Sequence, residues 1–129
     1  MSDRVLLRLR VGAGQAHYGG GLVDGAFVLR LFGDAATELL IRHDGDEGLL
    51  RAYSSVDFLA PVRGGDYLEV EAEITRIGNT SREMRFEARK FIAPSGRGDS
   101  SARLLEPPTI VARAVGICVV PVERQRERV

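Results

Sequence analysis

The chain has 129 residues, of which 44% are hydrophobic and 28% are charged, a composition typical of a globular domain rather than a disordered segment. The 18 basic and 18 acidic residues give a net charge of zero, which argues against a general nucleic-acid binder or membrane-surface binder and leaves only a local basic patch open. The length predicts one domain over residues 1–129 that can bury a core of its own.

The only cysteine is Cys118, so no disulfide can form within the chain and a cytoplasmic location is expected. It lies in the apolar run AVGICVV, which is typical of a small buried side chain rather than a catalytic thiol. The N-terminus lacks the apolar segment of a signal peptide, and no run approaches the roughly 20 apolar residues that span a bilayer.

The first third of the chain predicts a strand, a loop and a long helix. Residues 4–11 form the strand and residues 12–21 (GAGQAHYGGG) the loop. From Leu22, apolar residues recur at helical spacing as far as HDGDEG, where glycine and aspartate supply turn chemistry. Few positions between Leu22 and Ile41 are polar, so the helix should be covered on most sides.

The rest of the chain predicts strands over residues 49–62, 66–78, 82–92 and 109–122, with a mobile loop between the last two. The second of these strands alternates regularly: Leu68, Val70, Ala72 and Ile74 face one way, and Glu69, Glu71, Glu73 and Thr75 the other. Such alternation indicates an antiparallel strand with one buried face.

One long helix against one antiparallel sheet is an α+β arrangement. We expect a hotdog fold, in which a five-stranded antiparallel sheet wraps one long central helix. Small hotdog domains usually pair two sheets edge to edge, and the apolar helix also favours at least a homodimer.

Two stretches of the chain carry a narrower resemblance. HYGGGLVDGAFVLRLFGDAATELLIRHDGDEGLLRAY, followed by VDFLAPVRGGDYLEVEAEITRIGNTSREMRFEARK, resembles the 3-aminoacyl-CoA ammonia-lyases, which include the β-alanyl-CoA and 3-aminobutyryl-CoA enzymes of amino-acid fermentation. The segment VDFLAPV alone is a general acyl-CoA signature that thioesterases share. The resemblance runs from Val5 to Arg124 and is weakest in the loop from Pro94 to Pro108.

The resemblance implies reversible elimination of ammonia from a 3-aminoacyl-CoA to give a 2,3-enoyl-CoA. It also implies a homohexamer, and no cofactor other than the coenzyme A of the substrate. The reaction needs a base for the proton next to the thioester, hydrogen-bond donors for the enolate oxygen, and a group that manages the proton of the departing amine.

Given this resemblance, the candidate hydrogen-bond donors to the enolate oxygen are the backbone N–H groups of Gly19, Gly20 and Gly21. Backbone N–H groups at the start of a helix are unpaired, and a ligand can approach them closely at glycine because glycine has no Cβ. The alternative is a turn that needs positive φ angles. His17 and Tyr18 flank this loop and are candidate catalytic residues. His43, at the far end of the helix, is better explained as a cation favoured by the helix dipole.

Asp34 and Glu38 are the candidate acid and base, because residues four apart share one helix face. Burial in a dimer cleft would drive their pKa values apart. The alternative is an ion-pair stripe on a solvated face, formed with Arg30 and Arg42. Asp24 is a third carboxylate, which could instead stabilise the helix start.

Coenzyme A phosphates require positive charge, and the candidate contacts lie in GNTSR and the C-terminal tail. They are Asn79, Ser81, Arg82, Arg124 and Arg126. The sequence contains no metal-ligand spacing, P-loop or dinucleotide fingerprint, so no metal is expected. Two other functions remain open, a hotdog acyl-CoA thioesterase and a non-catalytic acyl-CoA binder. The preferred 3-aminoacyl group also remains open.

Overall fold

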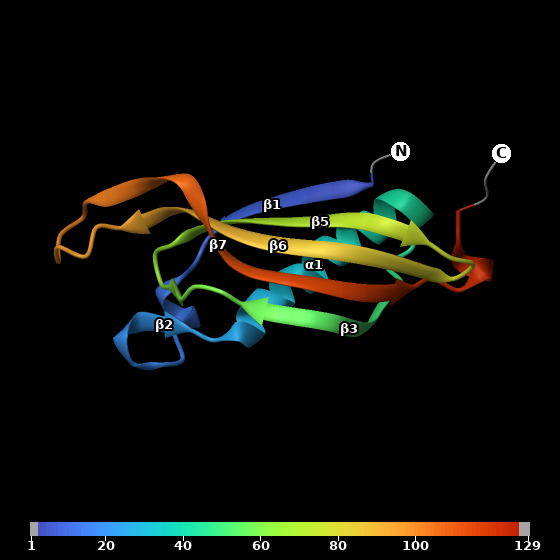
Figure 1. Cartoon of the computed structure of the whole chain (residues 1–129), viewed down its shortest axis with the longest axis horizontal. Helices are drawn as coiled ribbons and strands as arrows, with labels where there is room; N and C mark the ends of the chain where they lie inside the picture. Colours follow the sequence, from blue (N-terminus) through green and yellow to red (C-terminus); the bar gives the residue numbers. More distant parts are fainter. Residues whose placement is uncertain (1–2, 127–129) are drawn as a thin grey trace.

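An antiparallel five-stranded sheet carries one long helix on one face (Figure 1). The computed structural model describes residues 3–126. The strand order is β1-β5-β6-β7-β3, which confirms the predicted α+β hotdog arrangement. The bounds are β1 Arg4–Arg10, α1 Gly25–Asp44, β3 Leu49–Phe58, β5 Tyr67–Ile77, β6 Ser81–Pro94 and β7 Ala102–Val119. Two short strands, β2 (Leu22–Val23) and β4 (Val62–Arg63), form a second small sheet.

The core lies between the helix and the inner face of the sheet. The predicted alternation of β5 is confirmed, because Leu68, Val70, Ala72 and Ile74 are all buried. On the opposite face, glutamates and arginines of neighbouring strands form ion pairs. Arg89, for example, donates hydrogen bonds to Glu69, Glu71 and Glu87. The outer face therefore carries paired charges without a helix to cover it.

Helix α1 begins three residues later than predicted. Asp24 is its N-cap, and the Asp24 carboxylate accepts a hydrogen bond of 3.0 Å from the Phe27 N–H. This geometry confirms the helix-start role considered for Asp24. Leu22 is extended rather than helical, because Leu22–Val23 pairs with Val62–Arg63. The predicted end is confirmed, since Gly45 adopts a φ of 78° and donates to the Ile41 carbonyl.

The sheet covers only one side of α1, contrary to the expectation that most sides would be covered. Its apolar stripe is buried, with Phe32, Ala35 and Leu39 at 0% exposure. The opposite face is open within one chain and includes Ala26, Arg30, Asp34, Ile41 and Arg42. A solvated face of this width leaves room for a partner subunit.

Residues 93–108 were expected to be a mobile loop, and this prediction is wrong for most of the segment. β6 continues to Pro94 and β7 begins at Ala102, so the two strands form a hairpin that extends past the sheet (Figure 1). The ladder continues to the pair Pro94 and Ala102. The ends of the hairpin strands exchange backbone hydrogen bonds, which Gly, Ser and Pro content alone did not reveal.

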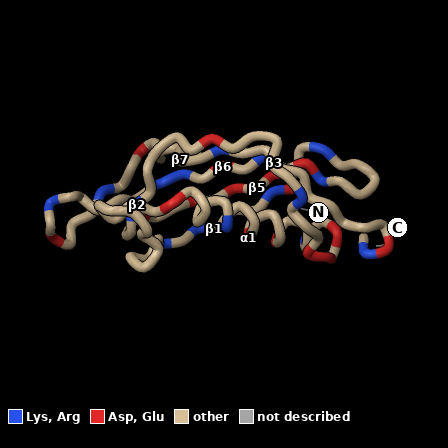
Figure 2. Tube along the Cα trace, turned by 90° about the horizontal axis from the view of Figure 1, so that it is seen from below, with Lys and Arg blue, Asp and Glu red and all other residues tan. Residues whose placement is uncertain are grey.

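Charged residues of both signs are interspersed along the chain (Figure 2), and their equal numbers give the net charge of zero. No helix within residues 3–126 is long and apolar enough to cross a membrane.

Candidate active site

The glycine loop before α1 is separated from the helix by strand β2. Gly19–Gly21 forms a 3₁₀ turn in which Gly20 and Gly21 both have a φ of 74°, a conformation that favours glycine. The loop is fixed at both ends, because the Tyr18 N–H donates to the Leu22 carbonyl and the Gly64 N–H donates to the Gly21 carbonyl. We had expected the glycines to lie directly at the helix N-terminus. They lie instead one short strand, β2, before it.

His17 and Tyr18 are both exposed within one chain, and Tyr18 is 60% exposed. Their side chains stand on the loop that leads into the glycine turn. They are therefore accessible to a ligand or to a partner subunit.

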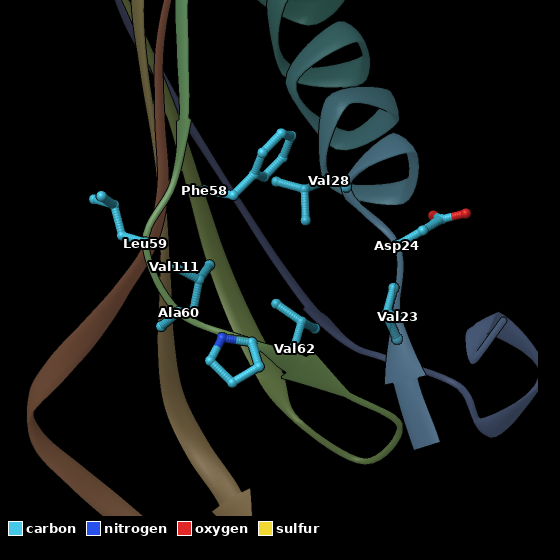
Figure 3. A pocket seen from close by; sticks show the side chains of 10 residues that line it. Val23, Asp24, Val28, Phe58, Leu59, Ala60, Val62 and Val111 are labelled. Carbon is cyan, nitrogen blue, oxygen red and sulfur yellow. The ribbon is translucent and has the colours of Figure 1, made fainter. Parts of the chain in front are cut away.

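An apolar pocket of about 430 Å³ opens at the N-terminus of α1 (Figure 3). The helix contributes Asp24, Gly25 and Val28, and the segment that follows β3 contributes the facing wall. The complete lining is Val23, Asp24, Gly25, Val28, Phe58, Leu59, Ala60, Pro61, Val62 and Val111. Apolar side chains dominate this set, so the pocket suits a short hydrocarbon group beside the helix start.

A second pocket of about 360 Å³ contains positive charge. The glycine turn forms one wall of it, and Arg63, Lys90 and Arg103 also line it. Lys90 is neutralised, because its Nζ lies 2.9 Å from the Asp66 Oδ2 and donates to the Pro61 carbonyl. Arg63 and Arg103 are exposed, so their guanidinium groups can reach an anionic ligand.

Sequence reasoning missed both arginines. Arg63 directly follows the acyl-CoA signature VDFLAPV, and this position was a usable signal. Arg103 fell in the segment that was expected to be a mobile loop. Only the extended hairpin of β6 and β7 brings it to the glycine turn.

The small sheet of β2 and β4 separates the two pockets. Val23 and Val62 line the apolar pocket, whereas the next residue, Arg63, lines the basic one. A ligand with an apolar end and an anionic end would therefore lie across this small sheet.

Asp34 and Glu38 do not line either pocket of their own chain. Asp34 is exposed, and Glu38 accepts a hydrogen bond of 2.8 Å from the Arg42 Nε. The Glu38–Arg42 half of the alternative, an i, i+4 ion-pair stripe, is therefore present. The burial that an acid–base pair requires is missing in one chain and would have to come from a partner subunit.

The candidate CoA residues Asn79, Ser81, Arg82 and Arg124 lie at the opposite end of the molecule from the glycine turn (Figure 1). The 14-residue strand β6 separates the two ends, and at about 3.3 Å per residue it spans roughly 43 Å. These residues cannot line either pocket of their own chain.

Arg82 has a structural role at that end. It is 1% exposed, and its Nε and one terminal nitrogen each donate to an Asp44 carboxylate oxygen at 2.9 Å. Burial would raise the pKa of Asp44, but hydrogen bonds from Arg82 and His43 outweigh burial, and the pKa is lowered. The guanidinium of Arg82 also donates to the carbonyls of Gly78 and Ser81, so it is occupied.

Three other predicted residues also lie away from the pockets. His43 lies in the last turn of α1, is 7% exposed, and has its Nδ1 3.2 Å from the Asp44 Oδ2, so it is a buried neighbour of the ion pair. Arg126 donates to the carbonyls of Ile41 and Arg42 at the helix end. Cys118 is buried as predicted, and burial raises the pKa of its thiol to about 11. Among residues 3–126, no His, Cys, Asp and Glu side chains gather in threes to hold a metal ion.

Comparisons with known proteins agree with this architecture. A model of the thioesterase superfamily matches residues 20–91. A 3-aminobutyryl-CoA ammonia lyase of Acetoanaerobium sticklandii is 60% identical over 123 residues, which cover 95% of this chain and 98% of that protein.

Solved structures extend the match to the complete fold. The β-alanyl-CoA:ammonia lyase of Clostridium propionicum superposes with a TM-score of 0.93 at 35% identity, over 98% of this chain and 90% of that chain. A hexameric hotdog-fold thioesterase of Campylobacter jejuni superposes with a TM-score of 0.71 at 18% identity, over 95% and 87% of the two chains, and shows the fold alone. The chain thus belongs to the 3-aminoacyl-CoA ammonia lyases, within the thioesterase superfamily of hotdog proteins.

Proposed function

We propose that this protein reversibly eliminates ammonia from a 3-aminoacyl-CoA, with 3-aminobutyryl-CoA as the preferred substrate. The observation that carries the proposal is the 60% identity, over 95% of the chain, to a protein named for that reaction. The apolar pocket at the helix start supports the same substrate, since its valines can surround the terminal methyl group of a butyryl chain.

The two pockets suggest how the substrate lies. The acyl group enters the apolar pocket, and the phosphates of coenzyme A lie toward Arg63 and Arg103 in the basic one. The thioester then crosses between them, beside β2 and the glycine turn, where the backbone N–H groups of Gly19, Gly20 and Gly21 are candidate donors to its oxygen. We propose this placement for coenzyme A in preference to Asn79, Ser81, Arg82 and Arg124.

In this mechanism a carboxylate removes the proton from C2, and the electron pair moves onto the thioester oxygen as an enolate. The pair returns to form the C2–C3 double bond, and the C3–N bond breaks with its electrons on nitrogen. A substrate amine in its ammonium form leaves as ammonia, which a neighbouring group can re-protonate. His17 and Tyr18 are the candidates for that second role.

Asp34 is the preferred base, because Glu38 is already paired with Arg42. Asp34 does not line the pockets of its own chain, so it would act in the site of a partner subunit. The proposal therefore includes at least a homodimer. Hexameric hotdog thioesterases among the structural neighbours support a homohexamer of this fold. Light scattering that gave the single-chain mass of 14.1 kDa at micromolar concentration would contradict this assembly.

One assay separates the proposed reaction from its rivals. The protein is incubated with crotonyl-CoA and ammonium, and the enoyl absorbance is followed before a thiol reagent is added. Loss of absorbance that depends on ammonium and releases no free thiol indicates the lyase, whereas free thiol indicates the alternative, a hotdog acyl-CoA thioesterase. Binding without either change would indicate a non-catalytic acyl-CoA binder and would reject the proposal.

A further inference from the structure

The side chain of Phe58 lies directly over Gly25, the first residue of α1. A Cβ atom built on Gly25 would stand 2.6 Å from the Phe58 Cζ and 2.7 Å from one Cε, which is closer than carbon atoms can approach. The ring therefore occupies the space that any other residue at Gly25 would fill. This contact joins the end of β3 to the first turn of the helix.

Successive side chains at the end of β3 point in opposite directions. In Figure 3 the Phe58 ring points toward Val28 and the helix, whereas the side chain of Leu59 points away from them. Both residues border the apolar pocket, and they are equally exposed in one chain, at 54% and 53%. The two neighbours differ in direction but not in exposure or apolar character.

We propose that Phe58 limits the length of the acyl chain that the apolar pocket accepts. The inference rests on the proposed function, because it assigns this pocket to the acyl group of a 3-aminoacyl-CoA. The ring forms the wall of the pocket between the end of β3 and the first turn of α1. An acyl chain that extends from the pocket along the helix would meet the aromatic ring, which occupies the space over Gly25.

The position of the Phe58 ring depends on steric contact with the helix at Gly25 rather than on a polar contact. Behind it, Val28 is 3% exposed and belongs to the core, so that side of the ring offers no free space. Removal of the ring would enlarge the pocket beside Gly25 and Val28, which already line it. A longer hydrocarbon chain could then bury its additional methylene groups there.

The test compares Phe58→Ala with Leu59→Ala on 3-aminobutyryl-CoA and 3-aminohexanoyl-CoA. Wild type and Leu59→Ala should favour the four-carbon substrate in kcat/KM. Phe58→Ala should lower that preference by about 10-fold or more, because one methylene in an apolar pocket already changes selectivity by about 10-fold. An unchanged preference in Phe58→Ala, or an equal change in Leu59→Ala, would overturn the proposal. So would a wild type that turns over both substrates equally well.

A binding measurement separates this inference from the proposed function. Butyryl-CoA and hexanoyl-CoA cannot undergo elimination, so their Kd values report the pocket alone. If wild type eliminates no ammonia but Phe58→Ala alone improves hexanoyl-CoA binding relative to butyryl-CoA, the lyase proposal fails and the role of Phe58 stands. If elimination occurs and the Kd ratio stays fixed, only the role of Phe58 fails. Mass measurements on Phe58→Ala and Leu59→Ala show whether either substitution alters the number of subunits in the assembly. If selectivity changes in both variants together with the number of subunits, the proposed role of Phe58 is rejected.

Discussion

The two ends of helix α1 differ in burial and in the pairing of their charged side chains. At the C-terminal end, the buried pair of Asp44 and Arg82 ties the helix to β6, and Gly45 and Arg126 satisfy the last carbonyls. At the N-terminal end, one pocket opens beside the first turn of the helix and a second beside the glycine turn, and His17 and Tyr18 are exposed. Charged residues at the closed end stabilise the fold, whereas Arg63 and Arg103 at the open end are exposed and available to a ligand.

The contrast predicts that substitutions at the open end change turnover and that substitutions at the closed end change stability. The largest effect is expected for the base that we place in the site of a partner subunit. Asp34→Asn keeps the shape of the side chain but cannot accept a proton from carbon. We expect kcat for ammonia elimination to fall by about 10²–10⁴-fold, with little change in thermal unfolding.

Glu38→Gln is the matched control on the same helix face. It removes the pair with Arg42, and we expect a stability change of about 1 kcal/mol or less and a smaller loss of kcat than for Asp34→Asn. Normal turnover by both variants would mean that the base lies elsewhere, and His17 would become the next candidate.

The next largest effect concerns the closed end. Asp44→Asn leaves the Arg82 guanidinium buried without its counter-charge, which should lower the free energy of unfolding by about 3–5 kcal/mol while the folded variant keeps its kcat. Replacing both residues with apolar ones of similar volume should recover most of that loss. Urea unfolding and kcat are measured together, and a loss of turnover in folded Asp44→Asn would erase the contrast between the ends.

The same residue predicts a pH dependence. Because the pKa of Asp44 is lower in the folded protein than in the unfolded chain, its carboxylate stabilises the fold above the unfolded value of 3.8. That contribution should disappear as the pH falls below 3.8 and through the folded pKa. The free energy of unfolding of wild type should therefore decrease more steeply in acid than that of Asp44→Asn. Parallel curves would show that Asp44 is not linked to acid unfolding.

A smaller effect is expected for the glycine turn. Gly20→Asn and Gly45→Asn both place an asparagine, which tolerates positive φ, at angles of 74° and 78°. If the turn binds the thioester, the added side chain at Gly20 should lower kcat/KM by about 10²-fold, the cost of one lost donor to an oxyanion. Gly45→Asn, at the closed end, should leave kcat/KM unchanged. Equal kinetics in the two variants would remove the turn from the mechanism.

The smallest effect concerns the phosphates of coenzyme A. Arg103→Ala should raise KM for the CoA substrate by about 10-fold, the value of one charged hydrogen bond, and leave KM unchanged for a short N-acetylcysteamine thioester without phosphates. Arg124→Ala is the matched control, an exposed arginine at the other end. If Arg124→Ala alone raises KM, coenzyme A is held by the residues first chosen from the sequence, in a partner subunit.

Patterns in short stretches of sequence correctly predicted the elements whose conformation depends on residues close together along the chain. The alternation along β5 and the helical spacing that ends at Gly45 depend on contacts within a few residues, so both were readable. The start of α1 was placed too early because Leu22 fits the helical spacing, but its pairing with Arg63 is a contact between distant segments. The hairpin over residues 93–108 was missed for the same reason.

The sequence by itself determined the fold class, because the fold class follows from the periodicity of the apolar residues, and its resemblance to the 3-aminoacyl-CoA ammonia lyases identified the family. Only the tertiary structure decided which charges are free. Arg82 and Arg103 look equivalent in the sequence, yet one is buried against Asp44 and the other is exposed beside the glycine turn. The environment of a charged side chain depends on which distant segments the fold brings beside it, and a linear pattern does not contain that information.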